Sequence, residues 1–153
     1  MIVGVLQKFG LAVFLSTLAL TAGASQDKDF VAARDAYAKG RIDQFERLAD
    51  KFPKDHLLAP YLRYWRLKSN NPSAEAMQAF IGQHADTPLS DRMRQDLVRK
   101  LAEAGDWPGV MHQAGRLVKT DVETQCFTLR ARLALNEATA QRDGAAFYRN
   151  ARD

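Results

Sequence analysis

The chain contains a single cysteine, Cys126, and this scarcity excludes an internal disulfide framework. Cys126 lies among apolar, helix-favouring residues in the stretch TQCFTLRARLAL. We expect its side chain to be buried, because free cysteine is among the most buried residue types. An intermolecular disulfide is the alternative interpretation. Neither a histidine nor a cationic cluster adjoins this cysteine in sequence, so a catalytic thiolate is not predicted.

Several motifs of catalysis and metal binding are also missing. The sequence has no nucleophile-elbow serine, no phosphate-cradling glycine loop and no Cys-x-x-Cys pair. Its histidines, His56, His84 and His112, are too widely spaced for two of them to share an i, i+4 face. Neither a metal nor another cofactor is therefore predicted. The glutamates considered as catalytic acids are all expected at polar or first-turn helix positions: Glu46, Glu75, Glu103 and Glu123.

A strong excess of one charge is absent as well. The formal net charge is +4. Without residues 1–24, which include Lys8, the chain has 21 basic and 18 acidic residues, or +3. Both signs are interspersed, which argues against a nucleic-acid-binding stripe. The length of 153 residues and the apolar fraction of 46% indicate one ordinary domain with a packed core.

The first 24 residues have the three-part pattern of a secretory signal peptide. Lys8 precedes the apolar run LAVFLSTLAL at residues 11–20, and small residues at positions 22–24 fit cleavage after Ala24. The run is about half of the ~20 residues that a membrane-spanning helix needs. We therefore expect export, with no membrane association after cleavage.

The remainder, residues 25–153, is predicted to be all-α, because apolar residues recur at three- and four-residue steps and no segment alternates with a period of two. Asp27 is expected to cap the first mature helix, and Gly40 and Gly105 to end helices. Thr120 and Glu123 have the spacing of a capping box. Helices are expected at about residues 28–39, 42–52, 57–68, 73–84, 88–104, 107–117, 121–134 and from 144 onward. The seventh of these is expected to bury Val122, Cys126, Leu129, Leu133 and Ala134.

The spacing of these helices favours an α-solenoid of stacked antiparallel hairpins. A pair of helices occupies about 32 to 36 residues, as in tetratricopeptide-like repeats. LAEAGDWPGVM and AYAKGRIDQFE each place a glycine and a polar residue between one helix end and the next helix. A compact bundle with the same short connections is the alternative.

One cluster is a candidate binding surface. Tyr61, Tyr64 and Trp65 alternate with the basic residues Arg63 and Arg66. Such a cluster suits the binding of a glycan or of a protein partner. Core packing of the rings is the alternative, since the aromatic residues also have helical spacing.

Five stretches carry a resemblance to a known family. They are F-x-x-A-R-x-A-Y at residues 30–37, DQFERL at 43–48, LAPYLRYW at 58–65, TPLSDRMRQDLVRKLAEAGDW at 87–107 and CFTLRARLAL at 126–135. Together with the export signal, they resemble the N-terminal superhelical region of soluble lytic murein transglycosylases. The resemblance covers most of the mature chain.

The resemblance implies a periplasmic location, an α-superhelix and a role in peptidoglycan turnover, where these enzymes cleave glycan strands to 1,6-anhydromuramoyl ends. The family's catalytic glutamate belongs to a Glu-Ser motif in a separate lysozyme-like domain, and no position of this sequence matches it. We therefore expect a truncated form that lacks the catalytic domain and is inactive alone. Its implied partners are peptidoglycan or a lysozyme-like domain. The alternative is a free-standing, tetratricopeptide-like protein-interaction module.

Overall fold

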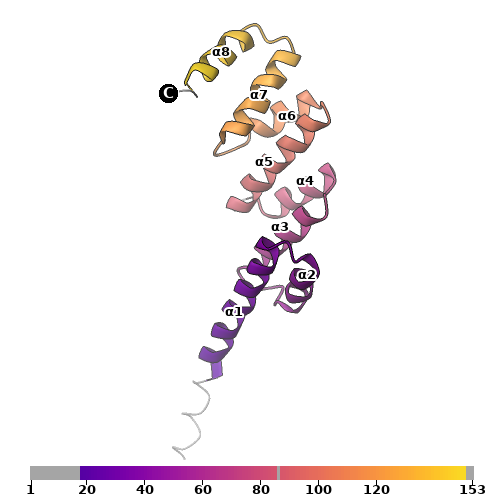
Figure 1. The fold of residues 1–153 in the computed structure, drawn as a ribbon, viewed down its shortest axis with the longest axis vertical. Coiled ribbons are helices and arrows are strands. Elements are labelled where there is room, and N and C mark those ends of the chain that lie inside the picture. Colours follow the sequence, from indigo (N-terminus) through magenta and orange to yellow (C-terminus); the bar gives the residue numbers. More distant parts are fainter. Residues whose placement is uncertain (1–17, 86, 151–153) are drawn as a thin grey trace, which may run out of the picture. The chain divides into compact units, whose positions relative to one another are not determined.

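The computed structural model describes residues 18–85 and 87–150, and within these ranges every regular element is a helix (Figure 1). This confirms the all-α prediction. The helices are α1 (Leu18–Ala38), α2 (Ile42–Lys51), α3 (Ala59–Ser69), α4 (Ala74–Gln83), α5 (Pro88–Glu103), α6 (Trp107–Ala114), α7 (Val122–Ala134) and α8 (Ala140–Asn150). Most of the predicted signal peptide lies outside the described residues. The chain forms two compact units, Met1–Leu62 and Arg63–Asp153, which are described separately below.

The first unit is built on a hairpin of α1 and α2. Gly40 makes the turn between them with a φ of +68°, a conformation that a side chain disfavours. Ala33 on α1 and Phe45 on α2 are fully buried, and the Phe45 ring packs 5.5 Å from that of Tyr37. The small alanine lets the two helices approach closely while the phenylalanine supplies most of the apolar contact.

The start of α1 differs from the prediction. A helix beginning near Lys28 with Asp27 as its cap is wrong, because α1 begins at Leu18 and contains Asp27 in its interior. The physical reason is the sequence ahead of Asp27. Between Leu18 and Asp27 the residues include three alanines, two leucines and no proline, so no proline interrupts the helix ahead of Asp27.

In the second unit, successive helices pack in pairs along the chain (Figure 1). Contacts join α4 to α5, α5 to α6, α6 to α7 and α7 to α8, and the one contact that skips a helix joins α5 to α7 among the described residues. The helix α5 is therefore central. Met93, Leu97 and Val98 on this helix are fully buried, each worth about 1.5–3 kcal/mol relative to exposure.

Most helix ends in this unit follow the sequence predictions. Ser73 caps α4 by accepting a hydrogen bond from the Ala76 amide at 3.2 Å. Gly105, with a φ of +73°, ends α5, and Asp106 then caps α6 by accepting from the Gly109 amide at 3.0 Å. These interactions satisfy backbone amides that have no partner within the helix.

The predicted capping box of α7 is wrong. Asp121, not Thr120, is the N-cap, and its Oδ1 accepts from the Thr124 amide at 2.7 Å. The pKa of the Asp121 carboxyl is lowered, chiefly by this hydrogen bond. Glu123 does not reach back to the cap but binds Arg99 on α5.

The predicted buried face of α7 is also wrong. Cys126 is exposed, and Val122 and Leu133 are 64% and 44% exposed. The helix instead buries Thr124 and Ala131. Small side chains face α5 and α6 because two neighbouring helices leave little space there.

Candidate functional site

Two residues of the predicted aromatic and basic cluster pack against other helices, and the other three are more accessible to solvent. Tyr64 is buried, its hydroxyl donates to the Asp96 carboxylate at 2.9 Å, and its ring lies 6.1 Å from that of Phe80. Tyr61 is half-buried, with its ring edge-on to Phe30 at 6.2 Å. Both tyrosines therefore pack against neighbouring helices, which is the alternative that the sequence left open for them.

The other three members of the cluster are more accessible. Trp65 and Arg66 are half-buried, and Arg63 is exposed. A glycan or partner surface at these positions stays a prediction. It would have to use Arg63 and the accessible part of Trp65, because the ring and hydroxyl of Tyr64 are already engaged.

A charged network surrounds Asp96 on α5. Lys68 Nζ lies 3.0 Å and Arg99 Nη1 3.1 Å from Asp96 Oδ1, beside the Tyr64 hydroxyl. Arg99 continues the network, since its Nε donates to Glu123 Oε1 at 3.0 Å. The network thus joins α3, α5 and α7 within the second unit, and it was missed from sequence because its contacts between helices join residues 24 to 32 positions apart.

Charge pairing in this network disfavours acid catalysis by its glutamate. The hydrogen bonds that Arg99 donates to Glu123 lower the pKa of the Glu123 carboxyl and raise the pKa of the Arg99 guanidinium. A general acid needs the opposite arrangement, an apolar setting that keeps the carboxyl protonated near neutral pH. Glu123 is therefore an ionised structural partner.

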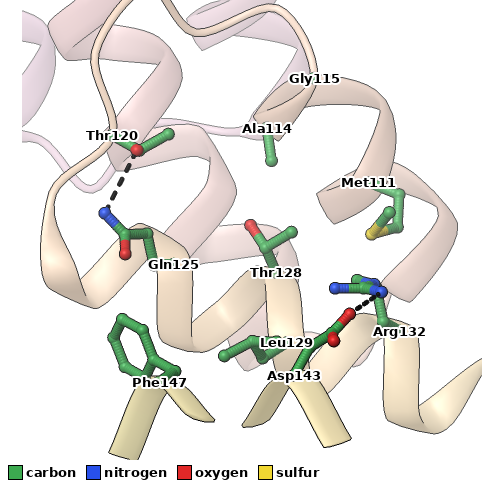
Figure 2. A pocket seen from close by; sticks show the side chains of 10 residues that line it. All are labelled: Met111, Ala114, Gly115, Thr120, Gln125, Thr128, Leu129, Arg132, Asp143 and Phe147. Atoms are coloured by element: carbon green, nitrogen blue, oxygen red, sulfur yellow. Dashed lines mark hydrogen bonds and ion pairs between the residues drawn. The ribbon is translucent and has the colours of Figure 1, made fainter. Parts of the chain in front are cut away.

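A pocket of about 390 Å³ lies between α6, α7 and α8 (Figure 2). Met111, Leu129 and Phe147 give it an apolar surface, while Gln125 and Arg132 add polar groups. The full lining is Met111, Ala114, Gly115, Thr120, Gln125, Thr128, Leu129, Arg132, Asp143 and Phe147. Its size and mixed lining suit the binding of a small group.

The charged groups of this pocket are already paired with each other. Arg132 Nη2 lies 2.8 Å from Asp143 Oδ2 (Figure 2). The same nitrogen lies 2.6 Å from Glu137 Oε1 and also donates to Thr139. These hydrogen bonds lower the pKa of both carboxyls. The arginine therefore fastens α7 to α8, and the pocket offers apolar contact without a protonated acid.

The remaining titratable candidates are dispersed. Glu75 is exposed in the first turn of α4, where its own backbone amide lowers its pKa, and Glu103 is exposed at the end of α5. No group of three or more His, Cys, Asp or Glu side chains in the described ranges is arranged to hold a metal ion. Within the same ranges, none of the helices has the length and apolar character needed to cross a membrane.

Comparison with known proteins adds no assignment. No protein-family model, curated protein or solved structure matches the chain.

Proposed function

We propose that the chain is the helical N-terminal portion of a periplasmic lytic transglycosylase and that it binds peptidoglycan without cleaving it. The five stretches of sequence resemblance support this proposal, and so does the signal-like pattern in the first 24 residues. In such an enzyme the chemistry belongs to a lysozyme-like domain, whose Glu-Ser motif has no counterpart here.

The packing order in the second unit is the observation that carries the architectural part of the proposal. A solenoid repeat contacts only its neighbours, whereas a compact bundle also brings its first and last helices together. Among the described residues, α8 contacts α7 alone, and α4 contacts α5 but neither α7 nor α8. We therefore interpret the helices from α4 to α8 as stacked hairpins of an α-superhelix.

Release of soluble muropeptides tests the catalytic part of the proposal. The purified protein is incubated with isolated sacculi, and the supernatant is assayed for anhydromuropeptides. None should be released, because no position of the sequence matches the Glu-Ser motif of the lysozyme-like domain. Arginines also lower the pKa of the Glu123, Glu137 and Asp143 carboxyls, which disfavours them as general acids. Release at a rate above that of buffer alone would overturn the proposal of a non-catalytic portion.

A free-standing protein-interaction module is the second candidate. The exposed side chains of Val122 and Leu133 on α7 favour it, because apolar surface on one helix face suits a protein partner. A downstream reading frame that encodes a lysozyme-like domain would favour the transglycosylase. A stable helical product in cells without such a frame would favour the module.

A further inference from the structure

A second concave surface of the second unit lies between α5 and the segment 115–121 that follows α6. This groove has a volume of about 830 Å³, against about 390 Å³ for the pocket between α6, α7 and α8. We call it the basic groove. It is lined by Ala85, Thr87, Pro88, Ser90, Asp91, Arg92, Arg94, Gln95, Arg116, Val118 and Lys119.

The two walls of the basic groove are joined by hydrogen bonds. Asp91 on α5 accepts from the backbone amides of Val118 and Lys119 at 3.0 and 3.3 Å. Gln95, one turn further along α5, donates from Nε2 to the Lys119 carbonyl at 3.0 Å. The segment is therefore fixed along α5 by its main chain, which leaves the side chain of Lys119 exposed.

Positive charge in the basic groove is poorly compensated. Arg92, Arg116 and Lys119 are exposed and make no ion pair with any carboxylate in the described part of the chain. Arg94 donates from Nη1 to the neutral side chain of the buried Gln113, at 2.9 Å. The described lining thus has four cations and one carboxylate, a net charge of +3 against +4 for the whole sequence.

The groove also offers apolar contact beside its cations. Val118 is 90% exposed, and Ala85 and Pro88 are exposed at the opposite wall. Guanidinium groups bind carboxylates in a planar, bidentate manner, while exposed apolar side chains favour a ligand with apolar groups of its own. Inorganic phosphate would use the cations only.

We propose that the basic groove binds an acidic peptide segment of a protein partner, with carboxylates at Arg92, Arg94, Arg116 and Lys119 and apolar side chains at Val118. This inference goes beyond the proposed function and does not depend on it.

A labelled peptide tests the inference. The probe is fluorescein-labelled Glu-Leu-Glu-Glu-Leu-Glu, titrated with the purified full chain by fluorescence anisotropy, with Gln-Leu-Gln-Gln-Leu-Gln as the uncharged comparison. The acidic peptide should bind, and its affinity should fall as salt is raised from about 50 to 300 mM, because salt screens exposed charges. Absence of binding by the acidic peptide, or equal binding by the uncharged one, would overturn the inference.

Matched variants locate the binding. The triple variant Arg92→Gln, Arg116→Gln, Lys119→Gln should bind about tenfold more weakly or worse, because three charge pairs are lost. The control variant Lys39→Gln, Lys51→Gln, Lys54→Gln removes the same charge from exposed positions of the first unit and should retain wild-type affinity. All six positions are exposed, so circular dichroism should show unchanged helix content. Equal weakening in the two variants would overturn the assignment of the groove.

Two competitors separate a peptide site from a general anion site. Tripolyphosphate and phosphatidylglycerol vesicles should each displace the peptide less effectively than unlabelled peptide does. Displacement as effective as that by the peptide itself would contradict a peptide ligand. A negative result in any of these measurements would not bear on the proposed peptidoglycan binding, because none of the samples contains peptidoglycan.

Discussion

At the scale of single residues, Asp121 shows how a neighbouring side chain replaces the cap that the sequence predicts. Thr120 and Glu123 have the correct spacing for a capping box. In the structure, however, the Glu123 carboxylate accepts from Arg99 instead of from the backbone amide at the cap. An ionised partner strengthens a hydrogen bond, and the salt bridge therefore competes successfully with the backbone amide. Asp121 then occupies the cap.

Substitution of this cap gives the first prediction. Asp121→Ala should lower the free energy of unfolding by about 1 kcal/mol, because the Thr124 amide loses its acceptor. Thr120→Ala, the matched control, should change it by less than about 0.5 kcal/mol, since Thr120 is exposed and outside the cap. Urea denaturation followed by circular dichroism measures both. A larger loss for Thr120→Ala than for Asp121→Ala would restore the capping box.

His84 gives a prediction about pH. Its ring lies 4.5 Å from that of Phe80, and Nε2 is buried without a hydrogen-bond partner in the described ranges. Burial, with a smaller contribution from the charge of Arg63, lowers the pKa of His84 below its ordinary value of 6.5. The unfolded chain therefore binds the proton more readily than the folded chain does. Stability should be full above pH 6.5 and fall as the pH decreases toward the folded pKa.

Urea midpoints between about pH 8 and 5.5 measure this dependence. His84→Gln should flatten it, whereas His112→Gln, at an exposed position, should retain the wild-type dependence. An unchanged pH dependence in His84→Gln would show that another group is responsible.

At the scale of helices, the ends were more predictable than the faces. Gly40 and Gly105 end helices as predicted, and Ser73 and Asp106 cap helices close to the predicted starts. Each of these residues acts through a hydrogen bond or backbone conformation within five residues of itself. The face of α7 depends instead on which helices pack against it. Of the five residues predicted to be buried there, four are exposed and Leu129 is half-buried.

Two glycines differ in backbone conformation but not in the free space around them. Gly105 has a φ of +73°, whereas Gly82 lies within α4, and an added Cβ would meet nothing within 4 Å at either position. Gly105→Ala should therefore destabilise the protein by about 1 kcal/mol, because the left-handed conformation disfavours a side chain. Gly82→Ala should stabilise it by about 0.5 kcal/mol, because alanine loses less entropy in a helix. Thermal unfolding of the two variants measures the difference, and stabilisation by both would contradict the assigned role of Gly105.

The candidate site was less predictable than the helices. Arg132 and Asp143 meet across the junction of α7 and α8, and Tyr64 meets Asp96 across a separation of 32 residues. No local pattern encodes such pairs, because the contact depends on how whole helices pack. The sequence did place Tyr64 in a candidate binding surface, but only the structure shows that its hydroxyl binds Asp96 on α5.

At the scale of the whole molecule, the proposed binding role agrees with a sequence in which the catalytic Glu-Ser motif has no counterpart. Arginines lower the pKa of the Glu123 and Asp143 carboxyls, and Glu75 and Glu103 are exposed near helix ends, while two concave surfaces of the second unit offer contact to a ligand. Mixed apolar and charged lining suits recognition. We propose peptidoglycan as the ligand because of the sequence resemblance to the superhelical region of lytic transglycosylases.

Cosedimentation with sacculi tests this central claim most directly. The purified protein, with its N-terminus established by intact mass, is centrifuged with isolated peptidoglycan and separately with an insoluble polysaccharide such as cellulose. We expect the protein to sediment with peptidoglycan and to stay in the supernatant with cellulose. Protein that stays in the supernatant in both samples would contradict the proposal and favour the protein-interaction module.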